Sequence, residues 1–289
     1  MNLLHTIEQL WFASRKVRLP IPPGALVLEV GSGDSPCPRS DVLFDLTLEN
    51  HERVGGRTIA DRPLVLGQAE CLPFCDKAFD YVICFHTLEH SSEPDCFLRE
   101  IERVGKAGYI ETPSFWFERL NPLTMHRLEV GLEKSGSIDR LVINRKLSPK
   151  PDSELANQVT KSFPGLLKEV SPYRIVTRYF WENRIDFRIM NPREFIEWNP
   201  PMTVTCVDTV DPRPLFRRLL KQYAQYFRIQ KRFDLKALLI CPECKSSSLA
   251  GDVQVGLFCN VCHSKFNTLN GIPVMHRSSY SKPMKWQLK

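Results

Sequence analysis

The sequence predicts an α/β fold in which a doubly wound parallel sheet is followed by a small cysteine-containing module. Short apolar strands alternate with helical or looped connections over roughly the first 115 residues, a pattern typical of parallel sheets whose faces are covered. Two Cys-x-x-Cys pairs near the C-terminus mark the second module, because paired thiols at this spacing are typical of metal sites.

The composition is that of a globular protein with one core and a small satellite domain. Of the 289 residues, 43% are hydrophobic and 25% are charged,. No apolar run approaches the roughly 18 residues that span a bilayer, and the N-terminus lacks the pattern of an export signal,. We therefore expect no transmembrane segment. Ten cysteines in such a chain favour a reducing compartment, so we expect a cytoplasmic location.

The formal charge of +6 is unevenly distributed. From Arg213 onward, 14 Lys and Arg face 3 Asp and Glu, a net charge of +11, which leaves −5 for residues 1–212. A basic C-terminal quarter can attract a nucleic acid, a protein or another polyanion, or it can simply be a solvated face.

The first elements follow from hydrophobic spacing and proline punctuation. A helix is expected over Leu3–Val17, with Pro20, Pro22 and Pro23 stopping it,. Further strands and a helix are then expected in turn. The strands are Ala25–Val30, Val42–Asp45, Leu64–Leu66, Phe79–Phe85 and Gly108–Pro113, with a helix at Pro94–Val104 before the last. Ligands of such sheets bind at the carboxyl ends of the strands.

Residues 114–200 have a different pattern. Alternating apolar and polar residues flank Lys134–Ser137, which predicts a hairpin,. A second hairpin is expected from Tyr179–Trp181 and Ile185–Ile189. Pro214–Phe233 has the three- and four-residue apolar spacing of an amphipathic helix,.

Glycines and acids at the first strand ends suit a nucleoside ligand. Gly31 and Gly33 follow the first strand directly, Glu29 lies within it, and Asp45 ends the second strand. Glycines allow close backbone approach, and a carboxylate accepts hydrogen bonds from ribose hydroxyls. The dinucleotide pattern Gly-x-Gly-x-x-Gly is absent, because Pro36 stands at its last position, which disfavours a pyrophosphate-bearing cofactor.

These residues resemble class I methyltransferases that depend on S-adenosylmethionine (SAM), particularly the branch of ubiquinone-biosynthesis and small-molecule enzymes. The resemblance covers about residues 25–115 and implies a Rossmann-like domain. The residues that carry it are Val27-Leu-Glu-Val-Gly-Ser-Gly33, Asp45, Gly67-Gln-Ala-Glu-Cys-Leu-Pro-Phe74, Ala78-Phe-Asp-Tyr-Val82, His86-Thr-Leu-Glu-His90, and Phe97-Leu-Arg-Glu-Ile-Glu-Arg-Val104 followed by Gly108.

The resemblance implies a set of cofactor-binding residues. Glu29, Gly31 and Gly33 would line the methionine end, Asp45 the ribose, Gln68, Ala69, Glu70 and Leu72 the adenine, and Phe85 and His86 would close over the cofactor. Two features depart from the family. Gln68 stands where an acid usually binds the adenine amino group, and only seven residues separate Gly33 from Asp41, so the first crossover helix is expected to be shortened or lost.

Methyl transfer needs an aligned acceptor and, for a hydroxyl or amine, removal of a proton. His86, His90 and His126 are the candidate bases. Of these, His90 and His126 are each predicted as a catalytic residue, His90 because it follows the fourth strand and His126 because it opens the first hairpin. The alternative for each is an ordinary loop histidine, and Glu89 is expected to be structural.

The C-terminal module is predicted to bind zinc. Cys241, Cys244, Cys259 and Cys262 form two knuckles separated by 14 residues, and four thiolates make a closed structural Zn²⁺ site without which so short a ribbon would not fold. The module resembles the small zinc-ribbon activator subunits of tRNA, rRNA and release-factor methyltransferases, here fused to the catalytic chain.

The expected organisation is an N-terminal helix (1–24), a methyltransferase domain (25–212, with a substrate-side insertion at about 114–200), a linker helix (213–236), a zinc ribbon (237–277) and a basic tail (278–289). The leading functional hypothesis is O- or N-methylation of a small molecule, sugar or lipid-linked intermediate. The alternatives are methylation of RNA or protein through the basic ribbon, and a non-catalytic methyltransferase-like scaffold.

Overall fold

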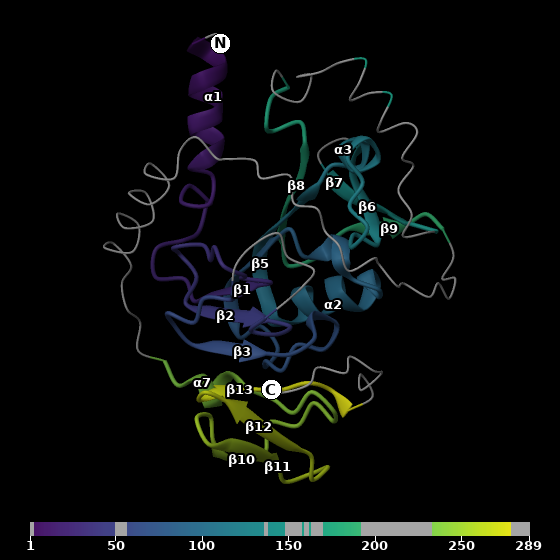
Figure 1. The fold of residues 1–289 in the computed structure, drawn as a ribbon. Helices are drawn as coiled ribbons and strands as arrows, with labels where there is room; N and C mark the ends of the chain where they lie inside the picture. The colour runs from purple at the N-terminus through teal and green to yellow at the C-terminus, as the bar shows by residue number, and fades with distance from the viewer. Residues whose placement is uncertain are drawn as a thin grey trace.

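The computed structural model describes residues 3–49, 57–135, 138–147, 158, 162, 170–191 and 233–278. A six-stranded sheet lies at its centre, in the order β3-β2-β1-β4-β5-β8 (Figure 1). The strands are β1 (Val27–Val30), β2 (Val42–Asp45), β3 (Leu64–Leu66), β4 (Phe79–Phe85), β5 (Gly105–Pro113) and β8 (Val176–Glu182). The first five are parallel, and β8 runs antiparallel to β5. The predicted α/β fold is confirmed.

Burial explains the apolar runs in the sequence. Every residue of β1, β2 and β3 is buried, as expected for parallel strands covered on both faces. Helix α2 (Pro94–Val104) begins with a proline in its first turn, where the missing N–H costs nothing, and buries its apolar side chains against the sheet,. Strand β5 begins earlier than predicted, at Gly105, because α2 leads into it without a loop.

The connection from β1 to β2 contains no helix, as predicted, and residues 31–41 form turns instead. Side-chain acceptors hold this connection in place. The buried carboxylate of Glu29 accepts hydrogen bonds from the Cys37 N–H at 2.7 Å and the Ser40 hydroxyl at 2.6 Å. Asp41 accepts one from the Val27 N–H at 2.9 Å. The loop therefore obtains from two acids the hydrogen bonds that a helix would have supplied internally.

Helix α1 (Leu3–Ala13) projects away from the sheet (Figure 1) and ends four residues before the predicted boundary. Two of the contacts that attach the end of this helix and the turn after it come from Phe12 and Arg15. Phe12 packs edge-on against Tyr173, with ring centroids 5.0 Å apart, and the Arg15 guanidinium pairs with Glu111 of β5 at 2.8 Å.

The insertion contains one of the two predicted hairpins. Strands β6 (Leu128–Ser135) and β7 (Ile138–Arg145) pair antiparallel around the expected turn. The hairpin predicted between residues 179 and 189 is wrong: β8 joins the main sheet, whereas β9 (Phe187–Ile189) pairs parallel with β7.

The free edge of β5 explains this difference. It offers β8 a seven-residue partner, and two glycines of β5 leave room for the Trp181 ring. A side chain at Gly108 would place its Cβ only 2.7 Å from the indole nitrogen.

The C-terminal module is a four-stranded antiparallel sheet in the order β10-β11-β12-β13, preceded by a short helix. Its elements are α7 (Leu235–Leu238), β10 (Leu249–Asp252), β11 (Gly256–Cys259), β12 (Lys265–Leu269) and β13 (Ile272–Pro273). The module lies beside β3 (Figure 1). Val274 forms a parallel bridge with Leu66, and the Met275 N–H donates to the Leu66 carbonyl at 2.7 Å. The module thus covers the β3 edge of the main sheet.

Most of the predicted linker helix (213–236) and nearly all of the basic tail (278–289) lie outside the described residues. In the part of the chain that is described, no helix combines the length and apolarity needed to cross a bilayer.

Candidate functional site

The glycine turn after β1 packs against the loop that follows β4. Gly31 and Gly33 have φ angles of +73° and +59°, the left-handed region that favours glycine. A Cβ at Gly31 would lie 1.9 Å from the Thr87 hydroxyl oxygen, so no larger residue fits there. The Gly31 N–H donates across to the Phe44 carbonyl of β2 at 2.8 Å. The turn is therefore fixed by both neighbouring strands.

Asp45 ties the end of β2 to this turn. One oxygen of its buried carboxylate accepts the Gly33 N–H at 2.9 Å, and the other accepts the Leu46 N–H at 2.7 Å. Each carboxylate oxygen can accept a further hydrogen bond. The structure thus brings together three residues predicted for the cofactor: both glycines and Asp45.

Glu29 has a mainly structural position. Its Oε2 is occupied by the loop after β1, whereas Oε1 has no hydrogen-bond partner among the described residues. Burial raises the pKa of this carboxyl, although Lys16 and Ser40 oppose the shift. Oε1 is therefore the atom of Glu29 whose hydrogen-bonding capacity the described residues leave unused.

Gln68 is engaged by the C-terminal module. Its Oε1 accepts the Arg277 N–H at 2.9 Å, and its Nε2 lies 2.8 Å from Nδ1 of His276. The same imidazole hydrogen-bonds to the backbone of Leu46, and burial lowers its pKa. An amide at position 68 can donate to the neutral imidazole, which a carboxylate cannot do. This gives a physical reason for glutamine at the position where an acid was expected.

The remaining residues predicted around the adenine form the 3-10 helix η1 (Ala69–Cys71) and the turn after it. Ala69 packs against the core. Glu70 accepts a hydrogen bond from the Ser91 hydroxyl at 2.6 Å, and burial raises the pKa of its carboxyl. Leu72 is fully buried in the core. Leu72 therefore contributes its side chain to packing.

At the end of β4, Phe85 and His86 face different neighbours. Phe85 packs edge-on against Tyr109, with ring centroids 5.3 Å apart. His86 has a φ of +48° and lies between two carboxylates, with Nε2 3.1 Å from Glu111 and Nδ1 3.5 Å from Glu89. Burial lowers the pKa of His86, but these carboxylates outweigh it and raise the value to about 9. At neutral pH His86 is a cation, which makes it unsuited to accept a proton.

The two predicted catalytic histidines meet in space although they are 36 positions apart in the sequence. The rings of His90, in the 3-10 helix η2 (Leu88–His90), and His126 pack edge-on at 4.7 Å. Burial lowers the pKa of His90 to about 4, so this imidazole is neutral at neutral pH. Nδ1 of His126 lies 2.6 Å from Oε2 of the buried Glu118 in α3 (Phe115–Leu120).

Sequence reasoning missed Glu111 and Glu118. Glu111 is fully buried and accepts hydrogen bonds from Arg15, His86 and Tyr109. Nothing in their sequence positions links Glu111 to Arg15, which precedes it by 96 residues. Glu118 lies only eight residues before His126, but the turn that joins them has no recognisable spacing.

A cavity of about 290 Å³ lies between α1 and the sheet. Its lining is aromatic and cationic: Trp11, Arg15, Arg18, Leu19, Tyr109, Tyr173, Arg178 and Phe180. Arg15 connects it to His86 through Glu111. The volume is near the lower limit for small-molecule pockets.

The four cysteines of the C-terminal module converge. Their sulfur atoms all lie within 4.8 Å of one another, with Cys241 and Cys262 at 3.5 Å and Cys244 and Cys259 at 3.6 Å. Tetrahedral zinc with bonds of about 2.3 Å requires sulfur separations of about 3.8 Å. The donor set and its spacing therefore fit a zinc ion.

The two cysteine pairs are local copies of one another. Lys245 and His263, each directly after a pair, have φ angles of +60° and +61°, and their N–H groups donate to the carbonyls of Cys241 and Cys259. The repeated turn places two sulfurs on the same side of each loop. His263 contributes its backbone to the second of these turns.

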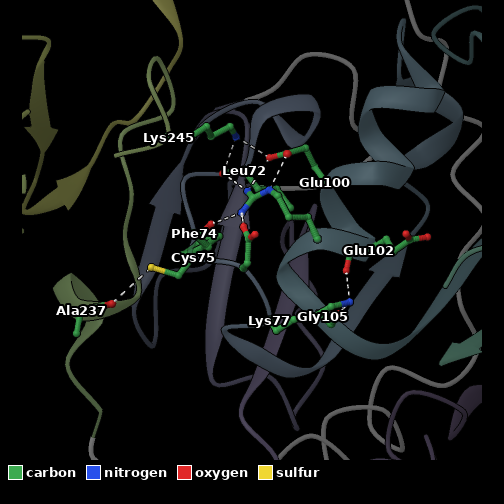
Figure 2. A network of polar contacts seen from close by, with 11 residues as sticks. Leu72, Phe74, Cys75, Lys77, Glu100, Glu102, Gly105, Ala237 and Lys245 are labelled. Atoms are coloured by element: carbon green, nitrogen blue, oxygen red, sulfur yellow. Dashed lines mark hydrogen bonds and ion pairs between the residues drawn. The ribbon is translucent and has the colours of Figure 1, made fainter. Parts of the chain in front are cut away.

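One turn of the module also contacts the main domain. Figure 2 shows Lys245 reaching Glu100 of α2 and the Leu72 carbonyl, at 2.8 and 3.4 Å. Glu100 is held by the Arg103 guanidinium at 2.8 Å through both of its oxygens. Below this network the Cys75 N–H donates to Leu238 at 2.8 Å. The cysteine-containing turns are thus packed against α2 and the segment after η1.

Comparison with known proteins agrees with this architecture. Residues 41–110 match the family model described as a methyltransferase domain, and they include Asp45, Gln68, His86 and His90. This segment of the chain is therefore similar to a methyltransferase domain. The match ends within β5, so the insertion and the C-terminal module lie outside it.

Three similar proteins illustrate the extent of the likeness. The demethylmenaquinone methyltransferase of Renibacterium salmoninarum is 36% identical over 92 residues, which cover 30% of this chain and 39% of that relative's length. The structure of a complex between the Haloferax volcanii Trm112 methyltransferase activator and a methyltransferase matches with a TM-score of 0.31 and 19% identity, over 44% of this chain and 69% of that one. The YcgJ protein of Bacillus subtilis matches with a TM-score of 0.33 and 20% identity, over 44% and 71%.

Proposed function

We propose that the chain is a SAM-dependent methyltransferase that acts in the cytoplasm on a small acceptor. The observation that carries the proposal is the hydrogen bond between Asp45 and the Gly33 N–H, which joins the glycine turn to the acid at the carboxyl ends of β1 and β2. Ligands of doubly wound sheets bind at this edge.

The residues at this edge fit SAM. Gly31 and Gly33 allow close approach to the methionine portion, Oε1 of Glu29 is a buried acceptor without a partner in the described structure, and Asp45 can accept from ribose hydroxyls. Gln68 would lie at the boundary of the adenine site while keeping its hydrogen bonds to the C-terminal module. SAM would supply a methyl group on a positively charged sulfur, an already activated leaving group.

We propose that His90 and His126 activate the acceptor. They lie just beyond Thr87, whose side chain packs on the glycine turn, and so next to the methionine end of the proposed cofactor site. Glu118 fixes the orientation of His126. Between this pair and the arginine-lined cavity, His86 contacts carboxylates on both sides. The aromatic and guanidinium lining of the cavity favours an acceptor with an aromatic or anionic part.

We further propose that Cys241, Cys244, Cys259 and Cys262 hold one structural Zn²⁺, in a ribbon that spans about residues 237–277. Four thiolates leave no open coordination position. Residues 274–277 of this ribbon extend the β3 edge and contact Gln68. The ribbon would therefore stabilise the adenine side of the cofactor site from within the same chain.

The described basic residues of the ribbon give less support to the alternative of RNA or protein methylation. Lys245 pairs with Glu100 and Arg277 with Glu243, so two of the three basic side chains described in the ribbon already pair within the protein, whereas Lys265 is exposed. The non-catalytic alternative is addressed by measuring cofactor binding.

The test is isothermal titration calorimetry of SAM with the zinc-loaded chain, comparing wild type, Asp45→Asn and Asp139→Asn. Asp139 is an exposed aspartate of β7 and serves as the matched control. We expect micromolar binding for wild type and control, and an affinity about tenfold or more lower for Asp45→Asn, because a hydrogen bond to a charged acceptor is lost. If the folded wild-type chain did not bind SAM, the scaffold alternative would replace this proposal.

A further inference from the structure

The cluster around His90 and His126 contains a third donor, Glu89. One ligand atom each from Glu89, His90 and His126 lies within 4.8 Å of the other two. The cluster is built from two segments, η2 and the turn before β6, which are joined by a hydrogen bond from the Arg127 N–H to the Glu89 carbonyl at 2.7 Å. The donor arrangement is therefore fixed by the backbone.

The carboxylate of Glu89 is placed unusually for a buried acid. The residue is 1% exposed, and neither oxygen has a hydrogen-bond partner among the described residues. His86 lies 3.5 Å from Oε1, beyond the usual hydrogen-bond length. A buried carboxylate needs a cation or strong donors to offset its lost hydration. The His86 ring forms a long ion pair with Oε1, and the His90 and His126 rings each offer an imidazole nitrogen within 4.8 Å of the same carboxylate.

His126 is oriented as a metal-binding histidine would be. Its Nδ1 is 2.6 Å from Glu118, so in the tautomer that donates from Nδ1 to this carboxylate the Nε2 lone pair faces away from it. Glu118 is itself held, by the Leu123 N–H at 3.1 Å and by a contact with the Lys146 ammonium. A carboxylate that fixes the outer nitrogen of a histidine is a recurring feature around metal ligands.

We propose that Glu89, His90 and His126 bind a divalent transition-metal ion, distinct from the zinc of the ribbon. Two imidazoles and one carboxylate favour Zn²⁺, Mn²⁺ or Fe²⁺ over Ca²⁺ and Mg²⁺, which prefer all-oxygen sites. Three protein ligands leave coordination positions open, in contrast to the four thiolates of the ribbon.

The location of the cluster gives this ion a role that rests on the proposed methyltransferase function. His90 and His126 would then act on the acceptor through the ion that they hold with Glu89, and this ion would lower the pKa of an acceptor hydroxyl, whose proton would pass to water. The acceptor oxygen would form a bond to the methyl carbon while the carbon–sulfur bond breaks, and that electron pair would stay on sulfur. The acceptor class is therefore one with an oxygen nucleophile.

Titration of the zinc-loaded full-length chain with Mn²⁺ tests the site, because thiolate sites select softer ions and bind Mn²⁺ weakly. Binding is followed by loss of the electron paramagnetic resonance signal of free Mn²⁺. We expect about one Mn²⁺ per chain for wild type, and an affinity about tenfold or more lower for Glu89→Gln, His126→Gln and Glu118→Gln. Glu133→Gln is the matched control, because this β6 carboxylate is partly exposed and pairs with Arg188 outside the cluster, and it should bind as wild type does.

Two readouts separate the outcomes. Zinc content and thermal unfolding of each variant show whether it is folded. If Glu89→Gln does not fold, His126→Gln still tests the site, because the amide of glutamine has nearly the volume of the imidazole. Unchanged Mn²⁺ binding by all three folded variants, or none by wild type, would overturn the site. Calorimetry with SAM is run in parallel: Mn²⁺ binding without SAM binding would reject the methyltransferase function and retain the metal site, and the reverse result would reject the metal site alone.

Discussion

Two of the clusters of potential metal ligands in the described part of the chain, the four cysteines of the ribbon and the cluster of Glu89, His90 and His126, are built in different ways. In the ribbon, Cys241 and Cys259 each begin a short turn that brings its own second sulfur into place. In the main domain, Glu89 and His126 come from separate segments, and Glu118 and the backbone hold them in position. The first cluster is made of repeated local turns, whereas the second depends on the tertiary fold.

This difference indicates what each ion would do. A site made of two short turns has little else to hold it together, so its metal contributes directly to folding. A site whose ligands are already fixed by a buried carboxylate and by the core is preformed, and its metal is available for chemistry. Removing metal should therefore affect the two regions unequally.

Zinc removal should have the largest effect. The chelated chain, or Cys259→Ser, should lose the ribbon structure, because zinc binding supplies on the order of 10 kcal/mol of folding free energy in small zinc modules. Hydrogen exchange should show the loss of protection in β10–β13 while β4 and β5 stay protected. Cys96→Ser is the control, since Cys96 is exposed and away from the ribbon cluster. If β10–β13 kept their protection from hydrogen exchange without zinc, the cysteine cluster would be preformed in the same way as the cluster of Glu89, His90 and His126.

The sequence was most informative where structure is local. Strands β2, β3 and β4 and helix α2 begin and end at the predicted residues, because buried parallel strands have continuous apolar runs and α2 has a clear apolar face. The β8–β9 hairpin was mispredicted because each strand pairs with a more distant partner. β8 pairs with the edge of β5, and β9 pairs with β7. Pairing with a distant strand leaves no local signal.

The seam between the ribbon and the main sheet should be the next most sensitive place. Met275 is fully buried there and its N–H binds the Leu66 carbonyl. We expect Met275→Ala to lower the free energy of unfolding by about 2–5 kcal/mol, the range for large-to-small changes in cores. Met190→Ala, at a residue that is 52% exposed, should have almost no effect. Chemical denaturation followed by circular dichroism measures both. Similar losses for the two variants would mean that the ribbon does not share the core of the sheet.

The candidate site was predictable only in part, for the same physical reason. Gly31, Asp45 and the four cysteines were found because each lies at a strand end or in a repeated spacing. The partners of Gln68 were not, since His276 follows it by 208 positions and approaches from the ribbon. Glu118 was not predicted as a site residue because its role depends on the turn that brings His126 beside it.

The contact between Gln68 and His276 gives the smallest and most specific test of this link between regions. Gln68→Glu restores the acid common in the family but removes the amide donor, so a carboxylate then faces the lone pair of a buried neutral imidazole. We expect a loss of about 1–3 kcal/mol in stability at neutral pH, the cost of an unsatisfied buried polar group. The loss should shrink as the pH falls below the ordinary histidine value of about 6.5, because a protonated His276 can donate to the new carboxylate. Thermal unfolding across this pH range measures the effect, and the His276→Gln variant should abolish its pH dependence. A substitution that stabilised the chain at neutral pH would show that the ribbon contact does not explain why glutamine occupies this position.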